Sequence, residues 1–81
     1  MDISEIIEGL SYNERKLLVA LDVLKGTASP SELIEKGGFS LEVEVMGAAS
    51  WLESKGLAVI KEDIQKFIEA ADKESIKKGL P

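Results

Sequence analysis

The sequence predicts a mainly α-helical domain with a small β-hairpin, in the winged helix-turn-helix arrangement. Its length of 81 residues suits one domain. Ser11 and Ser29 each stand three residues before a glutamate, the spacing with which a serine caps the start of a helix. At Leu57 the hydrophobic pattern changes from helical spacing to a run of strand-forming residues. Helices followed by a hairpin are the order in which that arrangement is built.

Two helices are expected in the first part of the chain. A short one over residues 2–9 has its apolar residues on one face, and a longer one runs from about Tyr12 to Leu24. The apolar residues of the first are Ile3, Ile6, Ile7 and Leu10, and those of the second are Leu17, Leu18, Leu21 and Leu24. The first helix is too short to be stable alone, so it must pack against the rest of the domain.

Two more helices complete a core expected over about residues 12–55. Residues 27–28 suit a short extended bridge, and Pro30 can occupy the first position of a helix that ends at Lys36. Ser40 is a third candidate N-cap, for a helix from Leu41 to Lys55. This last helix corresponds to the recognition helix of the arrangement.

The hairpin is expected over residues 57–70. Glu62 and Asp63 suit a tight turn, and Ile64 to Glu69 can return as the second strand. A final helical segment over residues 72–80 has Asp72 as its candidate cap.

Both faces of the first hairpin strand carry apolar side chains, because Leu57 and Val59 alternate with Ala58 and Ile60. We expect the helical core to cover one face and the two terminal helical segments to cover the other. If they do not, the second face is expected to be a surface for contact with protein.

The composition excludes several functional classes. The net charge of −5, from 10 basic and 15 acidic residues, opposes diffuse binding to nucleic acid or to anionic membranes. The chain has neither His nor Cys, so the usual zinc ligands and the usual neutral-pH proton carrier are absent. With no cysteine, no apolar run of membrane-spanning length and an acidic N-terminus, we expect a cytoplasmic protein without a membrane partner.

The predicted helix from Leu41 to Lys55 is a poor match to a DNA-reading helix. Its polar positions include Glu42, Glu44 and Glu53, whose carboxylates would repel phosphates. We therefore do not expect specific DNA binding through it.

The candidate nucleic-acid contacts are three lysines grouped around the predicted hairpin: Lys55, Lys61 and Lys66. They could contact an RNA backbone, or they could protect the edges of the strands from aggregation. Tyr12 and Trp51 could stack on bases, but single aromatics are more often partly buried. An interface position stays open for Trp51.

Four stretches resemble the start of the α subunit of archaeal-type phenylalanyl-tRNA synthetase. They are LSYNERKLL at residues 10–18, ASPSEL at 28–33, SWLESKGL at 50–57 and GLP at 79–81. The resemblance covers essentially the whole chain but a small part of that family's α subunit. The chain departs from the pattern at Gly47, where family members often have a basic residue, which puts a groove-reading role of this helix in doubt.

The resemblance implies a single winged-helix domain, residues 1–81, cut from a longer subunit of an α2β2 ligase. The implied parent enzyme uses ATP and Mg²⁺ to charge tRNA(Phe), but the class II motifs that hold them are absent here. No catalytic residue and no cofactor, phenylalanine or metal ligand can therefore be assigned to this chain.

Three hypotheses for its function follow. The first is an accessory domain that helps bind or position tRNA(Phe), weakly when isolated, in contact with other domains or with the β subunit. The second is a module for protein–protein docking or dimerisation. A winged-helix transcription regulator is the third, and the missing basic helix face argues against it.

We expect the purified chain to catalyse no phenylalanine-dependent exchange of pyrophosphate with ATP. The reason is that it lacks His, Cys, a phosphate-binding glycine loop and the class II motifs. Exchange above that of a mock preparation would contradict the expectation.

Overall fold

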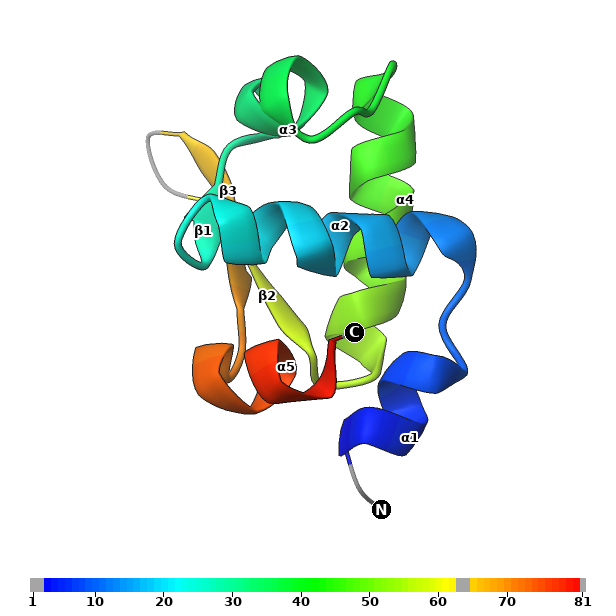
Figure 1. Ribbon diagram of the computed structural model, residues 1–81. Coiled ribbons are helices and arrows are strands. Elements are labelled where there is room, and N and C mark those ends of the chain that lie inside the picture. The colour runs from blue at the N-terminus through cyan, green and yellow to red at the C-terminus, as the bar shows by residue number, and fades with distance from the viewer. Residues whose placement is uncertain (1–2, 63–64, 81) are drawn as a thin grey trace.

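The computed structural model describes residues 3–62 and 65–80, and in them the helices and strands follow the order expected of a winged helix (Figure 1). The elements are α1 (Ile3–Glu8), α2 (Tyr12–Val23), β1 (Thr27–Ala28), α3 (Pro30–Lys36), α4 (Glu42–Ser54), β2 (Ala58–Glu62), β3 (Lys66–Ala70) and α5 (Lys73–Gly79). The fold class predicted from the sequence is confirmed. Asp63 and Ile64, expected in the turn and at the start of the second strand, lie outside the described residues.

Two serine–glutamate pairs begin α2 and α3 as the sequence predicts. The Ser11 hydroxyl accepts a bond from the Glu14 N–H (3.4 Å), and the Glu14 carboxylate accepts one from the Ser11 N–H (3.2 Å). Ser29 and Glu32 repeat the arrangement at 3.3 and 3.1 Å, with Pro30 at the first helical position. Each pair satisfies backbone donors that have no partner inside the helix.

The start of α4 differs from the expectation that Ser40 caps it. The N-cap residue is Leu41, which has no side-chain acceptor. The Glu44 carboxylate instead folds back and accepts the N–H groups of Ser40 (3.1 Å) and Leu41 (3.0 Å). Because this glutamate satisfies both donors, the helix starts one residue later than a serine cap would place it.

The hairpin gains a third strand, so that the sheet has the antiparallel order β1-β3-β2. The bridge at residues 27–28 pairs with β3, where Thr27 stands opposite Glu69 and Ala28 opposite Ile68. In the hairpin, Ala58 pairs with Ala70 and Ile60 with Ile68. Ala28 of β1 and Ile60 of β2 therefore lie on either side of Ile68 of β3, on the face of the sheet that packs against the core.

One face of the sheet is left uncovered. This corrects the expectation that the terminal helical segments would cover the second apolar face of β2. Ala58 and Ile68 are buried, but Val59 on the opposite face is 40% exposed. The terminal helices pack mainly against each other, through α1 and α5, with Ile7 and Ile76 buried. They therefore extend the core and leave the outer face of the wing open.

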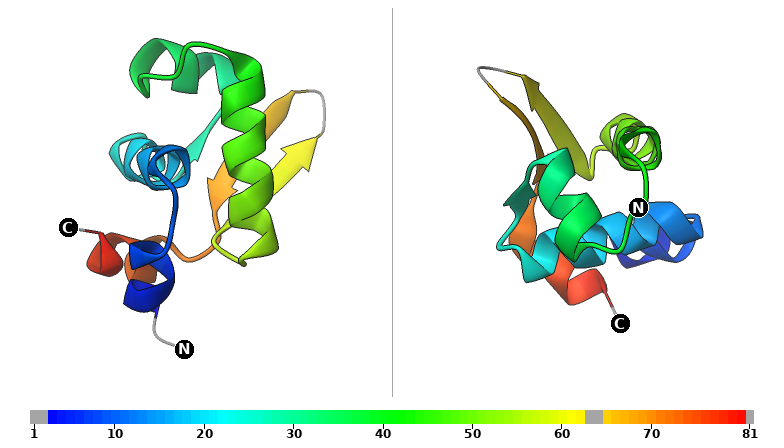
Figure 2. Two further views of the ribbon diagram at one scale, coloured as in Figure 1. Left: turned by 90° about the vertical axis from the view of Figure 1, so that its right-hand side faces the viewer. Right: turned by 90° about the horizontal axis from the view of Figure 1, so that it is seen from above.

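Helix α2 occupies the centre of the domain and contacts α3, α4, α5 and β3. Leu17, Leu18 and Leu21 are completely buried along it, and Val45 and Leu52 of α4 are equally buried. The hairpin extends away from α2, behind α4 (Figure 2). The core thus surrounds α2, and the wing projects from the side of the domain that lies beyond α4.

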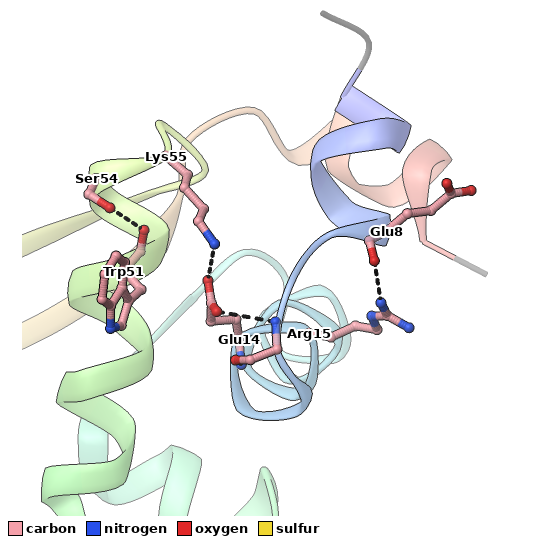
Figure 3. Close-up of polar contacts among 7 residues, drawn as sticks. Glu8, Glu14, Arg15, Trp51, Ser54 and Lys55 are labelled. Carbon is pink, nitrogen blue, oxygen red and sulfur yellow. Dashed lines mark hydrogen bonds and ion pairs between the residues drawn. The ribbon is translucent and has the colours of Figure 1, made fainter.

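A buried carboxylate ties the start of α2 to the end of α4. Lys55, the C-cap residue of α4, reaches Glu14 with its ammonium group 2.9 Å from Oε2 (Figure 3). The side chain of Glu14 is 8% exposed and that of Lys55 is 35% exposed. Burial raises the pKa of the Glu14 carboxyl, but hydrogen bonds from Lys55 and Ser11 outweigh this effect and leave its pKa below the ordinary value.

We expect Leu21→Ala to lower the free energy of unfolding by about 2–5 kcal/mol, because the substitution leaves a cavity at a fully buried position. Val23→Ala, two residues along the same helix, is the matched control. Val23 is 73% exposed, so its truncation should change stability by less than about 0.5 kcal/mol. Urea denaturation of both variants measures the difference, and equal effects would contradict the placement of α2.

We expect Glu14→Gln to destabilise the domain by about 1 kcal/mol near neutral pH, because it removes a charged hydrogen bond with a half-exposed lysine. The folded-state pKa of Glu14 lies below its unfolded value. The contribution of the charge is therefore complete above about pH 4.3 and is lost as the pH falls through the folded-state pKa. The denaturation midpoints of the two proteins should converge as the pH falls below about 4.3 and through the folded-state pKa of Glu14. A difference that does not narrow at any pH below about 4.3 would show that the charge of Glu14 is not involved.

Candidate nucleic-acid interface

Two of the three predicted contact residues lie on the wing, and both are paired with carboxylates. The Lys61 ammonium is 3.1 Å from Glu69 Oε2 and the Lys66 ammonium is 3.5 Å from Glu62 Oε1. Glu62 and Lys66 stand opposite each other in the hairpin register, which accounts for their contact. The wing therefore carries two neutralised lysines rather than a block of positive charge.

The third residue, Lys55, is not brought to the wing tip. It ends α4, at the base of β2, whereas Lys61 lies near the far end of that strand. A strand of five residues separates base from tip by about 16 Å. The ammonium of Lys55 points instead to Glu14 on α2 (Figure 3). The three lysines predicted as one group thus occupy two separate places.

The centre of the outward face of α4 carries no charged side chain, although Glu42 and Glu53 are exposed elsewhere on the helix. Glu44 is used at the helix start, and the Glu53 carboxylate accepts the N–H of Ile60 at 3.0 Å, on the side of β2. The exposed residues along the centre of the face are Val43, Gly47, Ser50 and Ser54. A side-chain atom added at Gly47 would have open space around it. This face offers neither the cations that hold phosphates nor the amide groups that read bases.

Both large aromatic residues are exposed. Trp51 is 63% exposed and its ring lies 5.8 Å from the Lys55 ammonium, while Tyr12 is 77% exposed and lies 5.6 Å from that of Lys16. Each ring is therefore accessible to a partner and already has a cation beside it.

A groove beside α2 was not predicted from the sequence, and its cations form no ion pair with a carboxylate among the residues that the structure describes. Tyr12, Lys16, Val19 and Val23 form one wall, at helical spacing, and Lys36 at the end of α3 lies on the other. The signal was present in the sequence, because these four residues repeat every three or four positions beside the leucine stripe of α2. We call this feature the α2 groove.

No group of three or more His, Cys, Asp or Glu residues that could hold a metal ion occurs in the described parts of the chain. Among the same residues, no helix has the length and apolar character needed to cross a membrane.

Comparison with known proteins identifies two curated relatives that are phenylalanine–tRNA ligase alpha subunits. The chain is 40% identical over 74 residues to the phenylalanine–tRNA ligase alpha subunit of Thermococcus onnurineus. It has the same identity over the same length with the phenylalanine–tRNA ligase alpha subunit of Pyrococcus horikoshii. Each match covers 89% of this chain but 14% of the relative, so the chain spans about one seventh of their length.

No family model matches the chain, and no solved structure matches it significantly. The two curated relatives nonetheless confirm the resemblance that the four sequence stretches predict. The chain is homologous to one segment of the α subunits of archaeal phenylalanine–tRNA ligases.

Proposed function

We propose that this chain is an accessory winged-helix domain of a phenylalanine–tRNA ligase α subunit that helps bind or position tRNA(Phe). ATP- and Mg²⁺-dependent aminoacylation would occur in a separate module of the enzyme. The domain would work in the cytoplasm, in contact with other domains or with the β subunit. The boundaries of the domain, residues 1–81 as part of a longer subunit, belong to the same proposal.

The observation that carries this proposal is the 40% identity to ligase α subunits over nearly the whole chain. The match covers 14% of each relative, as expected if this chain corresponds to an accessory domain rather than to a complete catalytic unit.

The charge distribution supports a weak contact, through the wing lysines Lys61 and Lys66. Both of their ion pairs are on the surface, with side chains 37–66% exposed. Exposed pairs contribute at most about 1 kcal/mol, so a tRNA phosphate can replace the carboxylate at little cost. Lys55 would contribute less, because its partner Glu14 is buried and would lose its counter-charge.

A weak contact of this kind would contribute to tRNA binding only when the rest of the enzyme also holds the tRNA. When other domains already hold the tRNA, the wing meets its phosphates at a high effective concentration. An isolated domain with a net charge of −5 is expected to bind tRNA weakly and without sequence preference. The wing would respond to the shape and charge of the backbone, because no described side chain of α4 is arranged for bidentate base contacts.

We expect the double substitution Lys61→Glu/Lys66→Glu to weaken tRNA(Phe) binding, measured by titration of labelled protein in the context of the assembled ligase. The opposite double substitution, Glu62→Gln/Glu69→Gln, releases the same lysines from their carboxylates and should strengthen binding. The two variants change opposite members of the same two ion pairs and differ in the sign of the charge change.

The salt dependence provides a second measurement. Each phosphate neutralised contributes about 0.7–0.9 to the log–log slope, so the slope should fall by about 1.4–1.8 in the lysine variant. If neither pair of substitutions changes affinity or slope, the wing does not contact tRNA. If Glu42→Ala or Glu53→Ala changes affinity while the wing variants do not, the contact lies on α4 instead.

A further inference from the structure

The α2 groove is a cavity with a volume of about 370 Å³ on the surface between α2 and the end of α3. It exists because small residues form its floor. A side-chain carbon added at Gly37 would lie 2.6 Å from the Leu33 carbonyl oxygen and 3.2 Å from the Ala20 Cβ. The chain after α3 can therefore approach α2 closely, and no larger side chain fills the space above the contact.

The wall on α2 is mostly apolar and open to solvent, with Lys16 as its charged member. Tyr12 is 77% exposed, Val19 is 44% exposed and Val23 is 73% exposed. They recur at helical spacing over three turns, a distance of about 16 Å along the helix axis. These exposed apolar side chains, with Lys16 between Tyr12 and Val19, lie beside the face of α2 that carries its buried leucines.

The rim of the α2 groove is positive, in a chain whose overall charge is −5. Arg15, Lys16 and Lys36 line it, and no aspartate or glutamate does so among the described residues. Arg15 donates to the Glu8 carbonyl oxygen at 2.9 Å, and the Lys16 ammonium lies 4.8 Å from the centre of the Phe39 ring. None of these three cations forms an ion pair with a carboxylate in the parts of the chain that the structure describes, unlike the lysines of the wing.

We propose that the α2 groove binds an acidic amphipathic segment of a protein. Aliphatic side chains of the partner would pack on Val19, Ala20 and Val23, and flanking carboxylates would meet Arg15, Lys16 and Lys36. A helix of about three turns matches the length of the apolar wall. The proposal goes beyond the tRNA role, because the surface lies on α2 and uses none of the wing residues.

The lining favours protein over RNA. Nucleobases are held by stacking on aromatic rings or guanidinium planes. Most of the lining offers valine and alanine methyl groups instead, and the Arg15 guanidinium already donates to the Glu8 carbonyl oxygen. Tyr12, the aromatic residue of the lining, already has the Lys16 ammonium 5.6 Å from its ring centre. Carboxylates on a partner would supply the counter-charge that the three cations lack among the described residues of the domain.

The test uses a labelled synthetic helical peptide of about 12 residues, with leucines on one face and glutamates beside them. A second peptide with lysines in place of the glutamates is the matched control. We expect the acidic peptide to bind with an affinity at least about tenfold higher than the basic one. In nuclear magnetic resonance spectra it should shift the backbone amide signals of Val19, Val23 and Lys36.

Two variants test whether the acidic peptide binds in the α2 groove. Lys16→Glu/Lys36→Glu and, separately, Val23→Asp should each weaken binding of the acidic peptide by about tenfold or more. Val23 is 73% exposed, so its substitution keeps the fold even if the change at Lys16 perturbs packing on Phe39. Lys61→Glu/Lys66→Glu is the control and should leave peptide binding unchanged.

Three results would overturn the proposal: equal binding of the two peptides, amide shifts confined to other surfaces, or shifts of these groove amides by tRNA in place of the peptide. Failure of tRNA to bind anywhere would count against the proposed function but would leave the peptide result intact. The two proposals can therefore fail separately.

Discussion

The burial of one face of α2 is the constraint on which the rest of this small domain depends. Helices α3, α4 and α5 and strand β3 all contact it, and its leucines have no exposed surface. A chain of 81 residues buries too little apolar surface to form more than one core. One helix, α2, therefore packs against most of the other elements. Glu14 fixes where that helix begins. One of its carboxylate oxygens caps the helix through Ser11 and the other holds Lys55, so one side chain sets both the start of α2 and its position against α4.

Features that depend on neighbouring residues could be predicted from the sequence. The serine–glutamate pairs at Ser11 and Ser29 act over three residues, and Asp72 likewise accepts the N–H of Ser75 to begin α5. The error at Ser40 has a local cause as well. A glutamate placed three residues after Leu41 can satisfy the same donors as a serine, and the sequence pattern does not distinguish the two solutions.

Features that depend on distant residues could not be predicted in the same way. Lys55 and Glu14 are 41 positions apart, and their pairing follows from the way α2 crosses α4. The wing pairs require the hairpin register, which places Lys66 opposite Glu62. Counting charges near the hairpin therefore overstated the positive charge available to a nucleic acid. The cations of the α2 groove, which have no ion-pair partner among the described residues, come from α2 and α3. The two helices meet where Gly37 follows α3 beside Ala20, a contact that the sequence pattern does not indicate.

The packing of α1 against α5 has a consequence for the order in which the domain assembles and opens. These helices come from opposite ends of the chain, so their contact closes the longest loop in the domain and carries the largest entropy cost of closure. Each is short, with six and seven residues, and neither is stable on its own. We therefore expect Ile7 and Ile76, although both are buried in the folded domain, to join the core late in folding. We also expect α1 and α5 to open more readily than the central helix, so that their amides exchange with solvent before those of α2.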